Sequence, residues 1–222
     1  MEILFDHRLG WQENQDVFIS EVMARFEDDE TEYALSHGWL KYTQDLWYQS
    51  RSTRIKIPHN IPSCHDIHIV DISFEEVNDI YQAYITKKNF KDLYNPIKNI
   101  LDEDKFLGFA VNGKTVAFSK LRHYDNNDFE SAMFCWDYKN PKLKLGIRTI
   151  YLEMEYGARR GAKYLYIGPG YEKSSIYKKD FDGFEWWTGS EWSTDKTLYE
   201  KLCIRDSKSK SFQKIVGIME AP

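Results

Sequence analysis

Residues 131–170 read SAMFCWDYKNPKLKLGIRTIYLEMEYGARRGAKYLYIGPG. The segment 131–138 is typical of a β-strand, and the Asn-Pro pair just after it predicts a turn. Apolar side chains recur at helical spacing over 145–158, and Gly161 stands in the position after a helix end that glycine favours. Residues 163–167 form a second compact apolar run. The stretch therefore predicts a strand, a helix and a parallel second strand, joined as a crossover.

Upstream of this crossover the sequence predicts a hairpin. Asn112-Gly113 lies between the strand-like runs 106–110 and 115–121. An Asn-Gly pair between two such runs is the strongest short-range hairpin signal, because both residues tolerate the left-handed backbone that the tight turn requires. A further strand is expected near 67–72, which is suggested by Ile67, Ile69 and Ile72.

Helices are expected at three further places. Ser73 is a good N-cap for a helix over 74–84, since two glutamates occupy its first turn and apolar residues share one face. Apolar spacing predicts a short helix over 16–26, and the Asn-Pro pair at Asn95 predicts the start of another. Residues 2–5 are apolar and are expected to form a strand.

Composition places the chain among globular proteins. Of its 222 residues, 42% are hydrophobic and 29% are charged, which supports a core and excludes a disordered chain. The net charge of −5 excludes a bulk nucleic-acid coat, which is usually basic. A local basic groove remains open where lysine and arginine cluster between Lys139 and Lys163; the alternative for that cluster is a solvated face.

Cysteine, histidine and hydropathy patterns exclude several kinds of site. The 3 cysteines are far apart without a CxxC pair, and the 6 histidines show no metal-binding spacing, so we expect neither a disulfide framework nor a metal. No apolar run approaches the roughly 18 residues that a membrane span requires. The first residues also lack the long apolar stretch of a signal peptide. We therefore expect a cytoplasmic protein without a membrane partner.

The order hairpin, strand, turn, helix, strand resembles the acetyltransferase-like (GNAT) fold. The resemblance implies an α/β fold with a mixed central sheet and flanking helices, in which two central strands part. In that fold the loop before the crossover helix offers backbone N–H groups to an anionic ligand, helped by the helix dipole. Here that loop is 140–146, and its single glycine is Gly146, whereas acetyl-CoA-binding loops carry several spaced glycines.

A closer resemblance is to the arginyl/leucyl-tRNA–protein transferases. Short pieces similar to that family's motifs follow one another in the family's order and cover most of 30–193. They are Ala34-Leu35, His37-Gly38-Trp39, Leu46-Trp47-Tyr48, Arg51-Ser52-Thr53-Arg54, Asp137 with Pro141, Leu145-Gly146, Tyr164-Leu165-Tyr166-Ile167-Gly168, and Tyr177-Lys178. The resemblance implies aminoacyl-tRNA as co-substrate with no bound cofactor. It also implies charged tRNA and an acceptor protein, peptide or small amine as partners.

Two departures from that family bear on the substrate. The family carries a cysteine cluster in its N-terminal region, but the matching stretch here, 34–57, has no cysteine, which excludes a metal or iron–sulfur cluster there. The family's Cys and Pro-Lys near its final motif are replaced by residues 170–175. The domain organisation expected from these matches is an N-terminal region over 1–62 packing on the main domain, a GNAT-like domain over 63–204 and a basic tail over 205–222.

Aminoacyl transfer to an amine needs little machinery, because the ester is already activated and the amine needs position, an oxyanion donor and a proton acceptor. The catalytic candidates are Asp137, Glu153 and Tyr177. Asp137 follows a strand end and could hold an amino or guanidinium group; its alternative role is an Asx turn before Pro141. Glu153 lies in the crossover helix, where a solvated glutamate is the alternative. Tyr177 matches the family's final motif.

Binding candidates lie where strands end, since ligands of open α/β sheets gather there. Aromatic rings can stack on the terminal adenine, and arginines can grip phosphate or carboxylate. The substrate-binding candidates are Trp136, Tyr138, Tyr166, Gly168, Tyr171, Lys178, Arg51 and Arg54. Those for phosphate or tRNA are Lys142, Lys144, Gly146 and Arg148. An ordinary core or surface role is the alternative for each.

Three functions remain open from the sequence. The first is an aminoacyl-tRNA-dependent transferase that moves an amino acid onto an amine. The second is an acyl-CoA-dependent N-acetyltransferase on the same fold, and the third is a non-catalytic binding protein that keeps the fold. Acetyl-CoA should stabilise the native state only under the second, and charged-tRNA binding that weakens steeply with salt supports the first.

Overall fold

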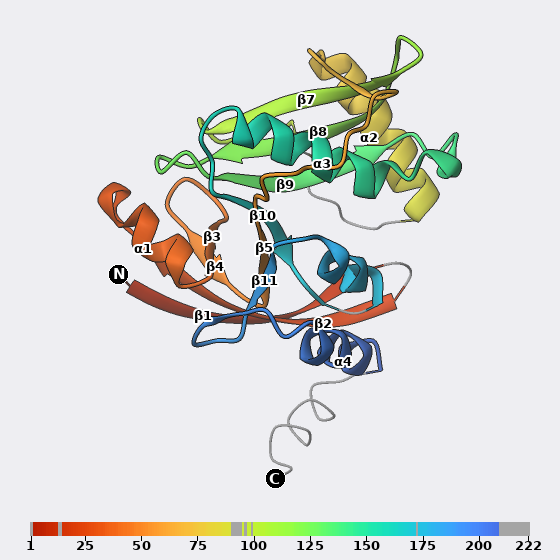
Figure 1. The fold of residues 1–222 in the computed structure, drawn as a ribbon. Helices are drawn as coiled ribbons and strands as arrows, with labels where there is room; N and C mark the ends of the chain where they lie inside the picture. Colours follow the sequence, from red (N-terminus) through yellow and green to blue (C-terminus); the bar gives the residue numbers. More distant parts are fainter. Residues whose placement is uncertain are drawn as a thin grey trace. The chain divides into compact units, whose positions relative to one another are not determined.

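The computed structural model of the chain describes residues 2–12, 15–89, 95, 97–98, 100–171 and 173–208 (Figure 1). The chain divides into two compact units. One joins Met1–Ile55 to Gly168–Pro222, and the other is Lys56–Ile167. The domain boundaries expected near residues 62 and 204 stay a prediction; the compact units follow other boundaries, because Gly168–Pro222 clusters with the N-terminal region.

The unit Lys56–Ile167 is built on a mixed sheet with the strand order β10-β9-β8-β7-β6. These strands are, in the same order, Tyr164–Pro169, Phe129–Trp136, Lys114–His123, Asp104–Val111 and His68–Val70. Strands β6 to β9 pair antiparallel, whereas β10 runs parallel to β9. The helices α2 (Phe74–Lys88) and α3 (Leu145–Ala158) flank the sheet, and the short 3₁₀ helix η2 (Pro141–Leu143) precedes α3. The predicted fold class, a mixed central sheet with flanking helices, is confirmed.

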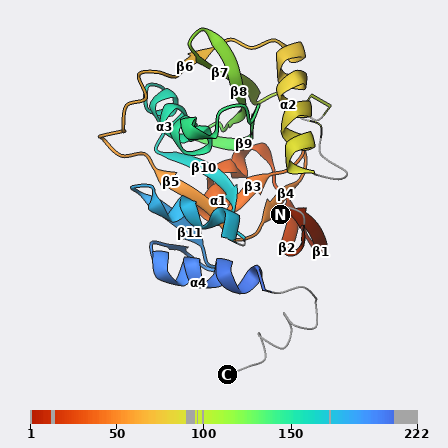
Figure 2. The ribbon, with the colours of Figure 1, turned by 90° about the vertical axis from the view of Figure 1, so that its right-hand side faces the viewer.

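Helices α2 and α3 cover opposite faces of this sheet (Figure 2). Phe118 of β8 belongs to a core cluster with Val77 and Ile80 of α2. The next residue, Ser119, donates a hydrogen bond to Glu153 of α3. Since successive residues of a strand point to opposite faces, the two helices lie on opposite sides of β8.

Strands β9 and β10 are paired over a short stretch. Among the described residues, the register joins Leu165 to Phe129 and Tyr166 to Glu130. Strand β9 continues to Trp136, where it still pairs with β8. The two parallel strands joined by α3 are therefore neighbours in one sheet and pair only near the start of β9, as expected for strands that part.

Local sequence signals produce the turns and caps that were expected. Asn112 and Gly113 have φ angles of 51° and 75°, so both adopt the left-handed backbone of a tight hairpin turn. The Ser73 side chain accepts from the Glu76 amide, and the Glu76 side chain accepts from the Ser73 amide, which completes a capping box. Gly161 has a φ of 81° just after α3, where a residue with a Cβ is disfavoured.

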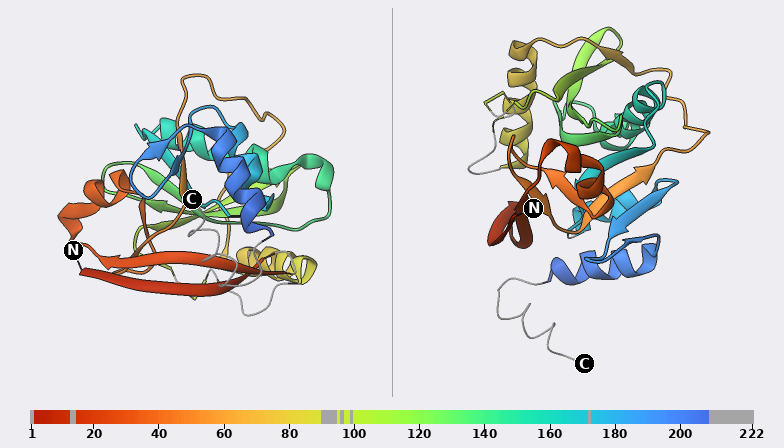
Figure 3. Two further views of the ribbon diagram at one scale, coloured as in Figure 1. Left: turned by 90° about the horizontal axis from the view of Figure 1, so that it is seen from below. Right: turned by 90° about the vertical axis from the view of Figure 1, so that its left-hand side faces the viewer.

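The other unit contains a four-stranded antiparallel sheet in the order β1-β2-β4-β3. These strands are Glu2–Gln12, Gln15–Arg25, Trp47–Gln49 and Trp39–Lys41, and the long β1–β2 hairpin is drawn in red in Figure 3. Strand β5 (Ser52–Lys56) pairs with β11 (Phe184–Trp187), which pairs with β12 (Trp192–Ser193). The helical segments are η1 (Asp28–Glu30), α1 (Thr31–Ser36), η3 (Lys173–Asp180) and α4 (Lys196–Asp206).

Gly38 ends the segment after α1 for a reason that the sequence alone does not reveal. Its φ is 75°, and a Cβ at this position would lie 2.4 Å from the Trp187 ring. Glycine is therefore required both by the backbone conformation and by the close approach of the indole.

One of the expected helices is wrong, and another lies partly outside the described residues. The helix expected over 16–26 is wrong, because Gln15–Arg25 is a strand whose register with β1 extends along its whole length. Valine and isoleucine in this segment favour strands. A partner strand close in sequence satisfies the backbone hydrogen bonds of the segment, so the helix that the apolar spacing suggested does not form. The helix expected from Asn95 falls partly outside the described residues; Ile97 and Lys98 form a turn.

Candidate functional site

The end of β9 presents an aromatic shelf formed by Trp136, Tyr138 and Tyr84. The Trp136 and Tyr138 rings stack at a centroid distance of 3.8 Å, and Tyr84 of α2 lies 5.6 Å from Tyr138. Tyr138 has a φ of 57°, so the chain turns sharply there and the ring folds back towards Trp136. The Lys88 Nζ lies 5.9 Å from the Tyr138 ring centroid. The structure thus brings two of the predicted substrate-binding residues together on a half-buried surface.

Asp137 stands between these two aromatic residues. Its Oδ1 accepts from the Lys139 amide at 3.1 Å, which is an Asx turn, and the Lys139 Nζ lies 3.6 Å from Oδ2. The Asp137 side chain is 8% exposed, whereas that of Lys139 is 70% exposed. The turn role considered from the sequence is therefore present. This role does not prevent the carboxylate from contacting a ligand, because Asp137 also borders a cavity.

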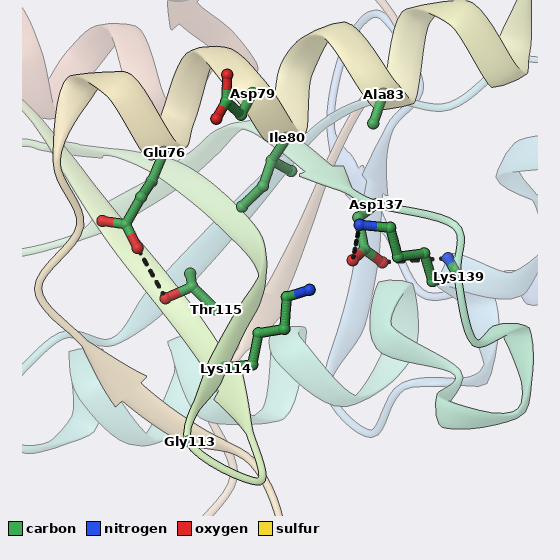
Figure 4. Close-up of a pocket in the computed structure, with 9 residues that line it drawn as sticks. All are labelled: Glu76, Asp79, Ile80, Ala83, Gly113, Lys114, Thr115, Asp137 and Lys139. Atoms are coloured by element: carbon green, nitrogen blue, oxygen red, sulfur yellow. Dashed lines mark hydrogen bonds and ion pairs between the residues drawn. The ribbon is translucent and has the colours of Figure 1, made fainter.

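This cavity lies between α2, the β7–β8 hairpin and the end of β9, and its volume is about 440 Å³ (Figure 4). Small-molecule sites commonly have volumes of roughly 300–1,000 Å³. The lining residues are Glu76, Asp79, Ile80, Ala83, Gly113, Lys114, Thr115, Asp137 and Lys139. Carboxylates and ammonium groups thus border one cavity together with apolar side chains of α2. Only Asp137 among these residues was predicted from the sequence.

Glu153 lies on the other face of the sheet and is 1% exposed. Its Oε1 accepts a short hydrogen bond from the Ser119 hydroxyl, while Oε2 has no hydrogen-bond partner among the described residues. Burial raises the pKa of Glu153 to about 7, against the lowering effect of the Ser119 and Ser131 hydroxyls. The solvated role considered from the sequence is wrong. The structure does not bring Glu153 together with Asp137, because α3 and the cavity beneath α2 lie on opposite faces.

The loop before α3 is more occupied than the resemblance implied. The Leu143 and Lys144 amides donate to Asn140 and Pro141 carbonyls at 3.2 Å each. The amides of Ile147 and Arg148 both donate to the Lys144 carbonyl. Two amides of the loop and two in the first turn of α3 are thus used by the chain itself.

The basic residues at this loop differ in whether a carboxylate already pairs with their charge. Arg148 forms a short ion pair with Asp66, which lowers the pKa of that carboxyl. Lys142 and Lys144 are exposed. At Gly146, an added Cβ would lie 3.7 Å from the nearest side chain, Phe134. Of the predicted phosphate-binding groups, Lys142 and Lys144 present exposed side chains, while the guanidinium of Arg148 is already paired.

A buried charge cluster on β7, β8 and β9 was missed by the sequence reasoning. Asp104 accepts from Arg122 Nε at 2.9 Å, and the Lys120 Nζ lies 3.3 Å from its other oxygen. Glu130 accepts from the Tyr124 hydroxyl at 2.5 Å and lies 3.5 Å from Arg122. Burial lowers the pKa of Lys120 and raises that of Glu130. The available signal was Lys120, a charged residue within the strand predicted over 115–121.

Tyr166, a predicted substrate-binding residue, lies next to this cluster. It is 1% exposed, and its ring centroid lies 6.0 Å from that of Tyr124. Its register partner on β9 is Glu130. The core role that the sequence left open for Tyr166 is the one the structure supports.

The remaining predicted residues belong to the unit that joins Met1–Ile55 to Gly168–Pro222. Arg51 pairs with Asp206 and donates to the Gly170 carbonyl at 3.2 Å. The Tyr171 hydroxyl forms a short hydrogen bond with Ser50, and the Arg51 guanidinium lies 5.5 Å from the Tyr171 ring centroid. Arg51 and Tyr171 are therefore brought together, with the arginine charge neutralised by a carboxylate.

Lys178 is a buried lysine in the same unit. Its Nζ donates to the Pro169 carbonyl at 2.8 Å and lies 3.5 Å from the Thr53 hydroxyl, which itself donates to the Gly168 carbonyl. Burial lowers the pKa of Lys178 to about 8. Gly168 has a φ of 68°, with open space where a Cβ would stand. Lys178 and Gly168 thus both lie at the backbone segment Gly168-Pro169.

Arg54 and Tyr177 have structural partners. Arg54 pairs with Glu185 at 2.6 Å and stacks over Trp192 at 3.9 Å from the ring centroid. Tyr177 is half-buried, with its ring centroid 6.2 Å from that of Phe181. Their predicted roles in substrate binding and catalysis stay predictions.

The described residues also bear on metal binding and on membrane insertion. Among the described residues, no group of three or more His, Cys, Asp or Glu side chains is arranged to hold a metal ion. Cys64, Cys135 and Cys203 are buried free thiols. Within the part of the chain that the structure describes, no helix has the length and apolar character to cross a bilayer.

Comparison with known proteins assigns no family. No protein-family model matches the chain, and no curated protein matches it. Solved structures show limited likeness to the chain. The C-terminal domain of a putative lysylphosphatidylglycerol synthetase from Agrobacterium fabrum matches at 8% identity and a TM-score of 0.46, over 80% of this chain and 71% of that one.

Two further similar solved structures are L-PGS from Bacillus licheniformis and a GCN5-related N-acetyltransferase from Kribbella flavida. For L-PGS the identity is 14% and the TM-score 0.42, over 80% of this chain and 62% of that chain. For the N-acetyltransferase the values are 16% and 0.38, over 64% and 54%. The chain thus spans less than two thirds of these two proteins. Likenesses at this level assign neither an activity nor a substrate to it.

Proposed function

We propose that this chain is a GNAT-like acyltransferase that takes an amino acid from aminoacyl-tRNA and transfers it to an amine, in the cytoplasm where charged tRNA is found. The observation that supports the proposal is the parallel pair β9 and β10, which is joined by α3 and paired only near Glu130 and Tyr166. Where parallel strands part, their backbone N–H and C=O groups are available to an extended ligand. The acyl donor would bind along this opening.

The loop before α3 favours tRNA over acyl-CoA as the donor. A pyrophosphate cradle needs free backbone amides at a helix N-terminus. Here the amides of Leu143, Lys144, Ile147 and Arg148 are engaged by the chain's own carbonyls. Exposed lysines remain, and point charges suit the phosphates of an RNA backbone. The ordered resemblance to the arginyl/leucyl-tRNA–protein transferases supports the same choice.

Asp137 is proposed as the group that receives the acceptor amine. Its carboxylate lies just after the end of β9 and borders the cavity beneath α2. The acceptor loses a proton, and its nitrogen attacks the aminoacyl carbonyl carbon. The C–N bond forms, the C–O bond to the ribose breaks, and the ribose oxygen leaves with the amine's second proton. Asp137 would hold the ammonium in position and accept the first proton.

The test is transfer of label from aminoacyl-tRNAs to a panel of N-terminal peptides and small amines. We expect the unmodified chain to transfer label, and Asp137→Asn to lower the rate by about 10²-fold or more, because a positioned proton acceptor commonly contributes that much. Asp125→Asn is the matched control, since Asp125 is exposed and outside the cavity lining. An unchanged rate in Asp137→Asn would show that Asp137 does not receive the acceptor amine, and it would not contradict the transfer reaction itself.

Binding of acetyl-CoA tests the alternative function, an N-acetyltransferase. A ligand that binds the native state raises the melting temperature by mass action. We expect no increase with acetyl-CoA, and tRNA binding that weakens steeply between low and high salt. Stabilisation by acetyl-CoA together with no label transfer from any aminoacyl-tRNA would replace the proposal by an N-acetyltransferase.

A further inference from the structure

The cavity beneath α2 carries two charged groups that no described residue neutralises. Asp79 projects from α2, and Lys114 begins β8 just after the hairpin turn; both are exposed. No ion pair or side-chain hydrogen bond joins either to a described residue, and Figure 4 shows Lys114 extending from its strand towards α2. One wall of the cavity therefore offers a free carboxylate and the opposite wall a free ammonium group.

The other charged lining residues are already engaged. Glu76 accepts from the Ser73 amide in the capping box and from the Thr115 hydroxyl at 3.2 Å. Asp137 and Lys139 form their own pair, with the lysine lying across the carboxylate in Figure 4. Glu76, Asp79 and Asp137 contribute three negative charges, and Lys114 and Lys139 contribute two positive ones, so the lining carries a net charge of −1. A ligand with both signs of charge fits this lining better than an anion does.

We propose that this cavity binds the acceptor as a zwitterion, an ammonium group close to a carboxylate or phosphate. Asp79 receives the ammonium together with Asp137, Lys114 receives the anion, and Ile80 with Ala83 contacts the carbon atoms between or beyond them. The inference rests on the proposed function, because it places the acceptor nitrogen beside Asp137 at the end of β9. Two sources supply this chemistry: a free α-amino acid, and a phosphoethanolamine headgroup.

The experiment measures binding to the full chain without tRNA, by ligand-observed NMR and calorimetry. The probes are the free amino acids, their carboxamides, their N-acetyl derivatives and phosphoethanolamine. We expect at least one free amino acid or phosphoethanolamine to bind, and blocking either charge of that probe to weaken binding at least about tenfold. Which of the two sources binds identifies the acceptor class.

Variants test the two named contacts. Asp79→Asn and Lys114→Met should each weaken zwitterion binding by about tenfold, whereas Asp125→Asn and Lys87→Met, which change exposed residues outside the cavity lining, should not. The carboxamide should bind the unmodified chain and Lys114→Met equally weakly, because it lacks the anion that Lys114 receives.

Binding of no probe, equal binding of an amino acid and its carboxamide, or binding unchanged in both cavity variants would overturn the inference. Because these measurements use no tRNA, they can fail while label transfer to peptides succeeds. They can also succeed when label transfer fails, so the inference and the proposed function are tested separately.

Discussion

At the scale of single residues, Glu153 couples stability to pH. Its pKa is raised by burial to about 7 from an ordinary value of 4.5. Below the lower value the carboxyl is protonated in both states. Between the two values the unfolded chain loses the proton while the folded chain keeps it. The free energy of unfolding should therefore fall as pH rises through this window, by up to ~3 kcal/mol, and level off above it.

Urea denaturation between pH 4 and pH 8 checks this with two variants. Glu153→Gln fixes the neutral form, so the part of the pH dependence that is due to this carboxyl should disappear. Glu155→Gln is the control on the same helix, because its carboxylate is 46% exposed and pairs with Arg159. If the pH profile of Glu153→Gln coincided with that of the unmodified chain, this carboxyl would not be the group responsible.

Asp104 is the residue on which the buried charge cluster depends. Its side chain is 0% exposed and neutralises both Lys120 and Arg122. Asp104→Asn should lower the free energy of unfolding by about 3–5 kcal/mol, because it leaves buried cations with too few carboxylates. Asp102→Asn, an exposed neighbour, serves as the control in the same denaturation series. A loss of under ~1 kcal/mol for Asp104→Asn would show that the cations find other partners.

At the scale of elements, α2 depends on its first turn. The capping box uses the Ser73 hydroxyl and the Glu76 carboxylate to satisfy amides that a helix start leaves without partners. Ser73→Ala should lower the free energy of unfolding by about 1 kcal/mol. Ser63→Ala, in the exposed loop before β6, should change it little. Equal stability of the two variants would mean that α2 is held by packing on the sheet alone.

Elements with local signals were the ones the sequence predicted well. The hairpin at Asn112-Gly113, the start of α2 and the end of α3 near Gly161 all depend on hydrogen bonds within a few residues. Strand β2 was mistaken for a helix, because its apolar spacing fits both periods and only the pairing with β1 decides between them. Helix α4 was not predicted, since its apolar face becomes clear only against β11 and η3.

At the scale of the whole molecule, a net charge of −5 means that RNA binding must depend on a local basic surface. Lys142 and Lys144 are the exposed cations at the start of α3. Changing either to Gln should weaken tRNA binding and reduce the slope of log affinity against log salt by about 1. Lys201→Gln, on the exposed face of α4, should leave the slope unchanged. Titrations at several salt concentrations measure this slope. Unchanged slopes in both loop variants would show that tRNA does not bind at this loop.

The sequence by itself determined the crossover, the hairpin, the first turn of α2 and the position of Asp137 at a strand end, because each depends on neighbours close along the chain. Only the tertiary structure decided that Glu153 is buried against Ser119, that Asp104 neutralises Lys120, and that Asp137 borders a cavity with Asp79 and Lys114. These arrangements depend on residues far apart in sequence whose desolvation and pairing are set when the sheet and helices pack.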